Sequence, residues 1–295
     1  MSKAAVQQFV RGYSIETTVP QAARVGRFAD AVPPGTRLFI AHVPGTDVAE
    51  TVTLAGRLRR EGMEPVPHVV ARRFRDMAML DAFLARLAGE AGVTQALVVA
   101  GDNATPEGAL TSGLEVLEAG LLERHGIRTI GVAGHPEGHR EVPDAVLREA
   151  LRRKNAYAAR TGADVRIVTQ FTFSADPVIA WLGSHAPDIG RLTVTAGLPG
   201  LATARTLLKY AMDCGVGPSI QAFSTRYASL TKLLTVSAPD DIVVALARHA
   251  GQDPGSPLAG VHFFPFGGFA KTAAWANKVA AGEFEITDNG GLRVD

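Results

Sequence analysis

Three polar residues, Glu16, Asp102 and Gln170, lie in or directly after short apolar runs, where a polar group is costly to bury. Glu16 lies inside SIETT, and partial desolvation there is expected to raise its pKa, which suits a general acid. Asp102 follows Gly101 in VVAGDN, where a glycine lets a ligand approach the backbone. Gln170, in IVTQFTF, carries an amide that both donates and accepts and therefore suits the edge of a heterocycle.

Each of these residues also has a purely structural interpretation. Glu16 would then be an interior carboxylate paired with an arginine, because buried glutamate is rare unless it is paired. Asp102 would form an Asx-turn or cap a helix in GDNATPEG. Gln170 would be a core amide whose hydrogen bonds are satisfied by the chain itself. For Asp102, position in the sequence leaves the two interpretations equally open.

Four histidines, His42, His68, His135 and His139, fall at or just after the ends of expected strands. His135 and His139 are four residues apart in GHPEGHRE, but the proline and glycine between them argue against a helix that would place both imidazoles on one face. We therefore predict no metal site and expect neutral imidazoles that bond to a cofactor. The basic run 151–155, together with Arg160, is expected to be a solvated helical face, with phosphate contact as the alternative.

Short β-rich runs alternate with segments of helical periodicity, which is the pattern of repeated βα units. We expect eight strands, at residues 13–19, 37–43, 64–71, 95–101, 129–135, 165–172, 191–197 and 260–266. Helical patterns lie between them, for example at residues 47–62, 79–92, 142–162 and 201–215. Eight βα units predict an α/β fold of the (β/α)₈ TIM-barrel type, in which the working residues lie at the carboxyl ends of the strands.

A doubly wound open sheet is the competing architecture, and its usual mark is a G-x-G-x-x-G loop after the first strand. Here the first expected strand ends in ETTVPQ, and the glycine-rich FGGF and AGLPG lack that spacing. No linker or composition shift divides the chain. We predict one catalytic domain over residues 1–295, with an extra helix around 223–235 and a peripheral C-terminal tail at 284–295.

The composition is that of a well-folded chain, with 46% hydrophobic and 20% charged residues. A net charge of +1 provides no field for nucleic acid or an anionic membrane, so we expect a small-molecule partner. Cys214 is the single cysteine, which excludes an intrachain disulfide, and we expect it to be buried. Without a signal-peptide pattern or an apolar span, a cytoplasmic protein is expected. A homo-oligomer is compatible with these features.

The order and context of the strand-end residues resemble the methylenetetrahydrofolate reductase family. SIETTVP resembles the segment with that family's catalytic glutamate, VPHVVA its third-strand Pro-His, and VVAGDN its Gly-Asp. GVAGHPEGHRE resembles its aromatic-Pro-Glu-x-His segment, and FFPFGGFAK its last-strand Phe-x-Phe followed by a basic residue. GADVRIVTQFTF is similar to its Gly-Ala-Asp…Ile-Thr-Gln-Phe-Phe strand, with one residue inserted between Gly162 and Gln170. The resemblance spans essentially the whole chain.

The resemblance implies a flavin barrel that reduces 5,10-methylenetetrahydrofolate to 5-methyltetrahydrofolate with NADH or NADPH as donor. It implies that Glu16 assists opening of the five-membered folate ring and that Asp102 lies between flavin and pterin. Gln170 would bind the pterin edge, and Lys271 the aminobenzoyl-glutamate. The residues expected to hold FAD are His42, His68, Gly101, Asp102, His135, His139 and Lys154.

The chain departs from the family pattern at several positions, as a divergent member would. Thr17 and Thr18 replace aromatic residues, Ala100 replaces a basic residue, and Ala158 falls near the place of the flavin-phosphate lysine, with Lys154 one turn earlier. Two other functions stay open. One is a non-redox lyase or transferase that acts on a pterin or another small molecule. The other is a non-catalytic partner subunit that binds flavin or folate.

Overall fold

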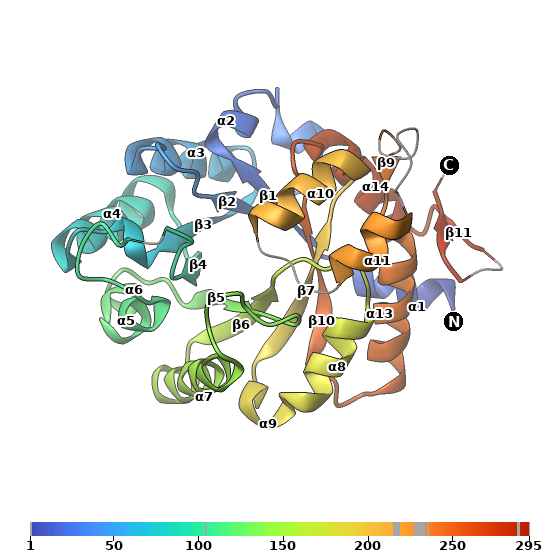
Figure 1. The fold of residues 1–295 in the computed structure, drawn as a ribbon. Helices are drawn as coiled ribbons and strands as arrows, with labels where there is room; N and C mark the ends of the chain where they lie inside the picture. Colours follow the sequence, from blue (N-terminus) through green and yellow to red (C-terminus); the bar gives the residue numbers. More distant parts are fainter. Residues whose placement is uncertain are drawn as a thin grey trace. The chain divides into compact units, whose positions relative to one another are not determined.

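In the computed structural model, eight parallel strands close into a barrel in the order β1-β10-β7-β6-β5-β4-β3-β2 (Figure 1). The structure describes residues 2–103, 105–214, 219–226, 234, 236–287 and 290–294. The TIM-barrel prediction is confirmed, and each expected strand overlaps an observed one. The barrel strands are β1 (Ser14–Thr18), β2 (Arg37–Ala41), β3 (Glu64–Val70), β4 (Gln95–Val99), β5 (Thr129–Gly134), β6 (Asp164–Thr169), β7 (Thr193–Pro199) and β10 (Leu258–Phe264).

Helices follow the strands along the chain, and several have identifiable start and stop signals. Asp47 begins α3 with a capping box, in which Asp47 accepts from the Ala49 N–H and Glu50 accepts from the Asp47 N–H. Gly92, with a φ of 59°, ends α4 in the left-handed conformation. The described helices are α1 (Lys3–Val10), α2 (Val19–Ala22), α3 (Val48–Arg60), α4 (Met77–Ala91), α5 (Gly113–Glu118), α6 (Leu121–Arg124), α7 (Asp144–Thr161), α8 (Asp176–Ser184), α9 (Ala186–Ile189), α10 (Ala204–Asp213), α11 (Ser219–Arg226), α13 (Asp240–Gln252) and α14 (Phe269–Ala281), with 3₁₀ turns η1 (Phe28–Asp30) and η2 (Ala71–Arg73).

The chain packs as two compact units. The β2–β5 unit comprises Glu16–Ala133 and Ala150–Ile167. Its strands are parallel. Ile40 of β2 lies beside Pro67 of β3, and His68 of β3 lies beside Leu97 of β4. Its core is filled by aliphatic side chains with almost no exposed surface: Leu38, Ile40, Leu58, Leu80, Leu84 and Leu87. This packing fixes the carboxyl ends of β2, β3 and β4 relative to one another.

The β7–β10 unit comprises Met1–Ile15, Gly134–Glu149 and Val168–Asp295. In it, β10 pairs with β7, and Ser14 of β1 lies beside His262 of β10. Short antiparallel pairs are added outside the barrel strands. They are β8 (Ala202–Thr203) with β9 (Val236–Ser237), and β11 (Glu285–Ile286) with β12 (Leu292–Arg293). The last pair lies in the segment 284–295, for which the sequence predicted a peripheral tail.

The extra helix expected around 223–235 is displaced from its predicted position. The observed helix, α11, begins at Ser219 and includes only residues 223–226 of that range. Residues 227–233 and 235 of the prediction lie outside the described residues. None of the described helices has the length and apolar character needed to span a membrane.

Candidate functional site

Glu16 and His68 form a buried pair in the β2–β5 unit. Glu16 Oε2 lies 3.4 Å from His68 Nε2, and the two side chains are 16% and 13% exposed. Burial raises the pKa of Glu16 to about 8, as expected from the sequence. Burial, together with the neighbouring His42, lowers the pKa of His68 to about 3. At pH 7 the pair is therefore a protonated carboxyl beside a neutral imidazole. Among the described ion pairs, Glu16 is paired with this histidine and not with an arginine.

Several buried polar side-chain atoms of the β2–β5 unit lack a hydrogen-bond partner in the described chain. In the described part of the chain they are His42 Nε2, Arg59 Nε, His68 Nε2, Arg73 Nε, Asn103 Oδ1 and Glu123 Oε2. Four of the six come from the ends of β2, β3 and β4 or the turns that follow them. An unpaired buried polar group costs about 1–3 kcal/mol. Such a concentration is typical of a surface that a polar ligand completes.

The segment after β4 is tied to the turn after β3. The Arg72 N–H donates to the Ala100 carbonyl over 2.9 Å, and the Glu107 N–H donates to the Arg72 carbonyl over 2.8 Å. The Glu107 carboxylate also lies 3.2 Å from Arg73 Nη1. These contacts hold Asp102 near the ends of β3 and β4.

Asp102 is exposed on this segment, and the described helix that follows, α5, is capped by Ser112 rather than by Asp102. The Asp102 charge acts on His42, whose pKa is lowered by burial and by Arg73 and raised by Glu107 and Asp102. Gly101 has a φ of 103°, and a Cβ there would lie 2.6 Å from Val70 Cγ1. The chain's own Val70 therefore already requires a glycine at this position, and the approach of a ligand to Gly101 stays a prediction.

Lys154 points inward from α7. Its ammonium donates to the Ala133 carbonyl over 2.9 Å, and burial lowers its pKa to about 8. The prediction of a solvated basic face is wrong for this residue. It holds for Arg153, which is 46% exposed and pairs with Glu118. A buried amine whose pKa is lowered by burial would be stabilised as a cation by an anionic ligand.

Replacement of Lys154 by methionine is expected to remove a pH dependence of stability. The lowered pKa penalises the folded protein below pH 8, and the penalty is relieved as pH rises from 8 to 10.5. The wild type should therefore gain about 2–3 kcal/mol of unfolding free energy relative to Lys154→Met over that window. Urea unfolding at pH 7 and pH 10.5 measures this. Arg153→Met is the matched control, and equal pH slopes for wild type and Lys154→Met would contradict the burial of the charge.

Gln170 lies just after β6, in the β7–β10 unit. The prediction that it lies within the strand is wrong, because β6 ends at Thr169. Its Oε1 accepts from the Phe171 N–H over 3.2 Å, and its Nε2 donates to the Cys214 carbonyl over a long 3.5 Å. Such weak contacts leave the amide able to turn toward a ligand. Cys214 itself is exposed, so the expectation of a buried cysteine is also wrong.

Glu137 anchors α11, a role that the sequence did not reveal. Its carboxylate accepts from the Ser219 N–H over 2.8 Å and from the Ser219 hydroxyl over 2.5 Å. Ser219 Oγ in turn accepts from the Phe173 N–H and contacts the Thr172 hydroxyl. The 135–139 loop, the chain after β6 and the start of α11 are thereby joined. The only sequence signal for this contact was the acidic residue in GHPEGH.

Replacement of Glu137 by glutamine should loosen α11. The amide nitrogen cannot accept a hydrogen bond, so one of two charge-assisted bonds is lost, at a cost of about 1.5–3 kcal/mol. Amide hydrogen exchange in residues 219–226 is expected to accelerate about tenfold or more. Glu141→Gln, at an exposed position near the same loop, should leave the exchange unchanged. Unchanged exchange in Glu137→Gln would show that the contact does not hold the helix.

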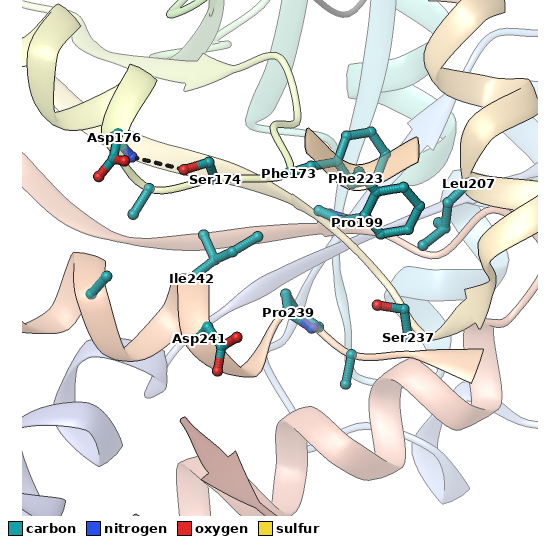
Figure 2. Close-up of a pocket in the computed structure, with 13 residues that line it drawn as sticks. Phe173, Ser174, Asp176, Pro199, Leu207, Phe223, Ser237, Pro239, Asp241 and Ile242 are labelled. Carbon is teal, nitrogen blue, oxygen red and sulfur yellow. Dashed lines mark hydrogen bonds between the residues drawn. The ribbon is translucent and has the colours of Figure 1, made fainter. Parts of the chain in front are cut away.

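A cavity of about 290 Å³ opens beside α11 within the β7–β10 unit (Figure 2). The rings of Phe173 and Phe223 stack in its wall, with centroids 4.3 Å apart. Asp176 and Asp241 also line it, and its described lining contains no lysine, arginine or histidine. Such a cavity suits an uncharged or cationic aromatic group and disfavours a polyanion.

The remaining predicted residues also lie in the β7–β10 unit. The rings of His135 and His139 pack edge to face at 5.2 Å, and the chain between them is not helical, as expected. Lys271 is exposed in the first turn of α14. The roles of these residues toward a cofactor or substrate stay predictions. Within the described ranges, no three His, Cys, Asp or Glu side chains are placed to hold a metal ion.

No protein-family model matches the chain. Two solved structures share its fold. An uncharacterized protein from Clostridium thermocellum that binds two copies of 5-methyl-5,6,7,8-tetrahydrofolic acid aligns with a TM-score of 0.54 at 10% identity, over 92% of this chain and 98% of that one. A putative phosphonomutase from Burkholderia cenocepacia J2315 aligns with a TM-score of 0.50 at 15% identity, over 95% and 98%. At these identities the likeness establishes the barrel fold, and function must be argued from the residues.

Proposed function

We propose that the protein reduces 5,10-methylenetetrahydrofolate to 5-methyltetrahydrofolate, with a nicotinamide as electron donor. The observation that carries the proposal is Glu16, a carboxyl on a barrel strand whose pKa of about 8 keeps it protonated at neutral pH. The methylene carbon accepts hydride only after the five-membered folate ring opens to an iminium ion, and a proton donor promotes that opening. A protonated Glu16 supplies the proton.

Two further observations support a reduced folate as the substrate. The order of strand-end motifs resembles the reductase family along the whole chain. The fold is shared with a Clostridium thermocellum protein that binds 5-methyltetrahydrofolic acid, which is the product of the proposed reaction. Each observation alone is general, but both point to the same ligand class.

Other residues have separate roles in the proposal. Asp102 carries an exposed carboxylate on the segment held near the ends of β3 and β4, and its negative charge suits the iminium cation formed in the reaction. Gln170 offers its weakly bonded amide to the pterin edge. Lys271 offers an exposed ammonium to the glutamate tail. The acidic cavity beside α11 is a poor place for the glutamate tail, because Asp176 and Asp241 in its lining would repel the carboxylates of the tail.

FAD is the carrier that the resemblance implies, and when bound it supplies hydride to the substrate. The β2–β5 unit offers suitable partners for its flat ring, because His42, His68 and Asn103 leave buried polar atoms unpaired. Lys154 offers a buried amine that a phosphate would keep charged. We therefore include FAD in the proposal, held in this unit by His42, His68, Asn103 and Lys154.

The proposal is tested with the purified full chain. NADH or NADPH is supplied with methylenetetrahydrofolate, with and without added FAD, and 5-methyltetrahydrofolate is measured by mass spectrometry. The visible spectrum is recorded before and after anaerobic addition of the nicotinamide. We expect flavin bands that bleach and a methyl product that depends on the nicotinamide. Absence of methyl product with both donors, even with added FAD, would overturn the proposal.

A non-redox activity on a folate is the second candidate. It is favoured by the Glu16–His68 pair, in which an acid and a neutral base lie 3.4 Å apart. Such a pair performs proton transfer without a redox group. Consumption of methylenetetrahydrofolate without oxidation of the nicotinamide would identify this activity.

A further inference from the structure

Ser184, His185 and Asp144 form a hydrogen-bonded series in the β7–β10 unit. Ser184 Oγ lies 2.9 Å from His185 Nδ1, and His185 Nε2 lies 3.1 Å from Asp144 Oδ1. Ser184 ends α8, His185 follows it directly, and Asp144 begins α7. A hydroxyl, an imidazole and a carboxylate in this order are the parts of a nucleophilic triad, which is recognised by geometry and roles rather than by sequence position. None of the three residues has a role in the proposed reduction of folate.

Asp144 decides which nitrogen of His185 carries the proton. Hydrogen bonds from Arg148 and from His185 lower the pKa of the Asp144 carboxyl, so that it is ionised at neutral pH. An ionised carboxylate only accepts hydrogen bonds, so His185 Nε2 donates to it. In the neutral imidazole the other nitrogen, Nδ1, then accepts from the Ser184 hydroxyl. His185 Nδ1 is therefore the base that faces the serine.

The surroundings hold the imidazole in place and leave the hydroxyl accessible. His185 is only 7% exposed, and its ring lies against that of Trp181, with centroids 5.5 Å apart. Ser184, in contrast, is exposed. Its hydroxyl also lies 3.4 Å from the Trp181 carbonyl oxygen, but the 2.9 Å distance to His185 makes the better hydrogen bond. A fixed base thus contacts a hydroxyl that a molecule in solution can reach.

Arg148 provides a positive charge beside Ser184. Its Nε donates to Asp144 over 2.8 Å, and its Nη1 donates to Asp188 over 2.7 Å and to the Ser184 carbonyl oxygen over 3.0 Å. These described bonds use three of the five N–H groups of the guanidinium, and the other two belong to Nη2. Such a donor stabilises the negative oxygen that forms when a hydroxyl attacks a carbonyl carbon.

We propose that Ser184 is a nucleophile that takes the acyl group from small carboxylic esters and releases it to water. The Ser184 oxygen bonds to the ester carbonyl carbon as its proton moves to His185 Nδ1. The bond from that carbon to the alcohol oxygen breaks, and the proton passes from His185 to the departing alcohol. Water then attacks the acyl-serine and gives a proton to His185, the carboxylic acid leaves, and Ser184 recovers the proton. One ester and one water become one acid and one alcohol, and no electron donor or acceptor is required.

The purified full chain with p-nitrophenyl acetate tests this activity. We expect a burst of about one p-nitrophenol per chain followed by slower release, with the acetyl group mapped to Ser184 by peptide mass spectrometry after an acid quench. Ser184→Ala should lose the burst. Asp144→Asn should slow it about tenfold or more, because an amide no longer fixes the tautomer of His185. Ser224→Ala is the matched control, since Ser224 is also exposed on a helix but donates to the Gln221 carbonyl oxygen.

Several results would contradict the ester-cleaving role of Ser184. They are an unchanged burst in Ser184→Ala, acetyl groups found only on lysines, and an unchanged burst in Asp144→Asn. A burst without later release would overturn the hydrolytic step. Methyl formation from methylenetetrahydrofolate should be the same in both variants as in wild type, so ester cleavage and folate reduction fail separately. Thermal unfolding checks that each variant is folded, and Ser184→Ala, which removes one exposed oxygen, keeps the test decisive if Asp144→Asn is not.

Discussion

Glu16→Gln should lower kcat/KM for methylenetetrahydrofolate about 10²–10⁴-fold, because the amide occupies the same volume but cannot donate the acidic proton. Reduction of bound FAD by the nicotinamide should be retained, since that half-reaction does not use the Glu16 proton. Stopped-flow measurement of the two half-reactions checks this. Glu90→Gln, at an exposed position on α4, is the control. Equal loss of both half-reactions would show that Glu16 is structural.

Glu16→Gln should also change the pH dependence of the reaction rate and the pH dependence of stability. With the Glu16 pKa at about 8, the wild-type rate should be flat below pH 8 and fall about tenfold per unit above it. The raised pKa also means that folded protein loses stability as pH rises from 4.5 to 8. Glu16→Gln should lack this loss and be about 2–4 kcal/mol more stable than wild type at pH 9, relative to their difference at pH 4. Parallel stability curves would contradict burial of the carboxyl.

Gly197→Ala is expected to destabilise the fold by about 3 kcal/mol, because there is no room for a methyl group where β7 passes the end of β6. A Cβ there would lie 2.2 Å from the Thr169 carbonyl oxygen, 2.8 Å from Phe264 Cε2 and 3.1 Å from the Gln170 carbonyl carbon. The strain falls on the residues that position Gln170, so folate affinity should fall as well.

Urea unfolding measures the effect, and Gly183→Ala on α8 provides the control. A Cβ at Gly183 meets nothing within 4 Å. Alanine there should stabilise the protein by about 0.5–1 kcal/mol, because it lowers the entropy of the unfolded chain and favours helix. If Gly197→Ala costs less than about 1 kcal/mol, the strands are not packed as closely as described.

The barrel could be predicted because each strand is a short apolar run bounded by turn residues, and such a pattern depends only on local sequence. The raised pKa of Glu16 was also predictable, since a carboxylate within SIETT has apolar neighbours on its own strand. The partner of Glu16 could not be predicted. His68 meets it through pairing of distant segments, and the sequence had suggested an arginine.

Features decided by contacts between distant residues were missed or misplaced. Lys154 was placed on a solvated face, but the helix turns its amine toward the Ala133 carbonyl. Cys214 was expected to be buried, but it lies exposed at the end of α10. The contact between Glu137 and Ser219 joins residues 82 positions apart. A local pattern does not identify the distant residue that a given polar side chain will contact.

The separation of Glu137 and Ser219 also has a consequence for the order in which the protein matures on the ribosome. At about 5–20 residues per second, Glu137 is made roughly 4–16 s before the serine that it will hold, given a spacing of 82 residues. Throughout that interval the wall that Phe223 contributes to the cavity cannot exist, because α11 has not been translated. The barrel strands up to β7 are translated earlier, so the cavity beside α11 is completed only after most of the barrel strands have been synthesised.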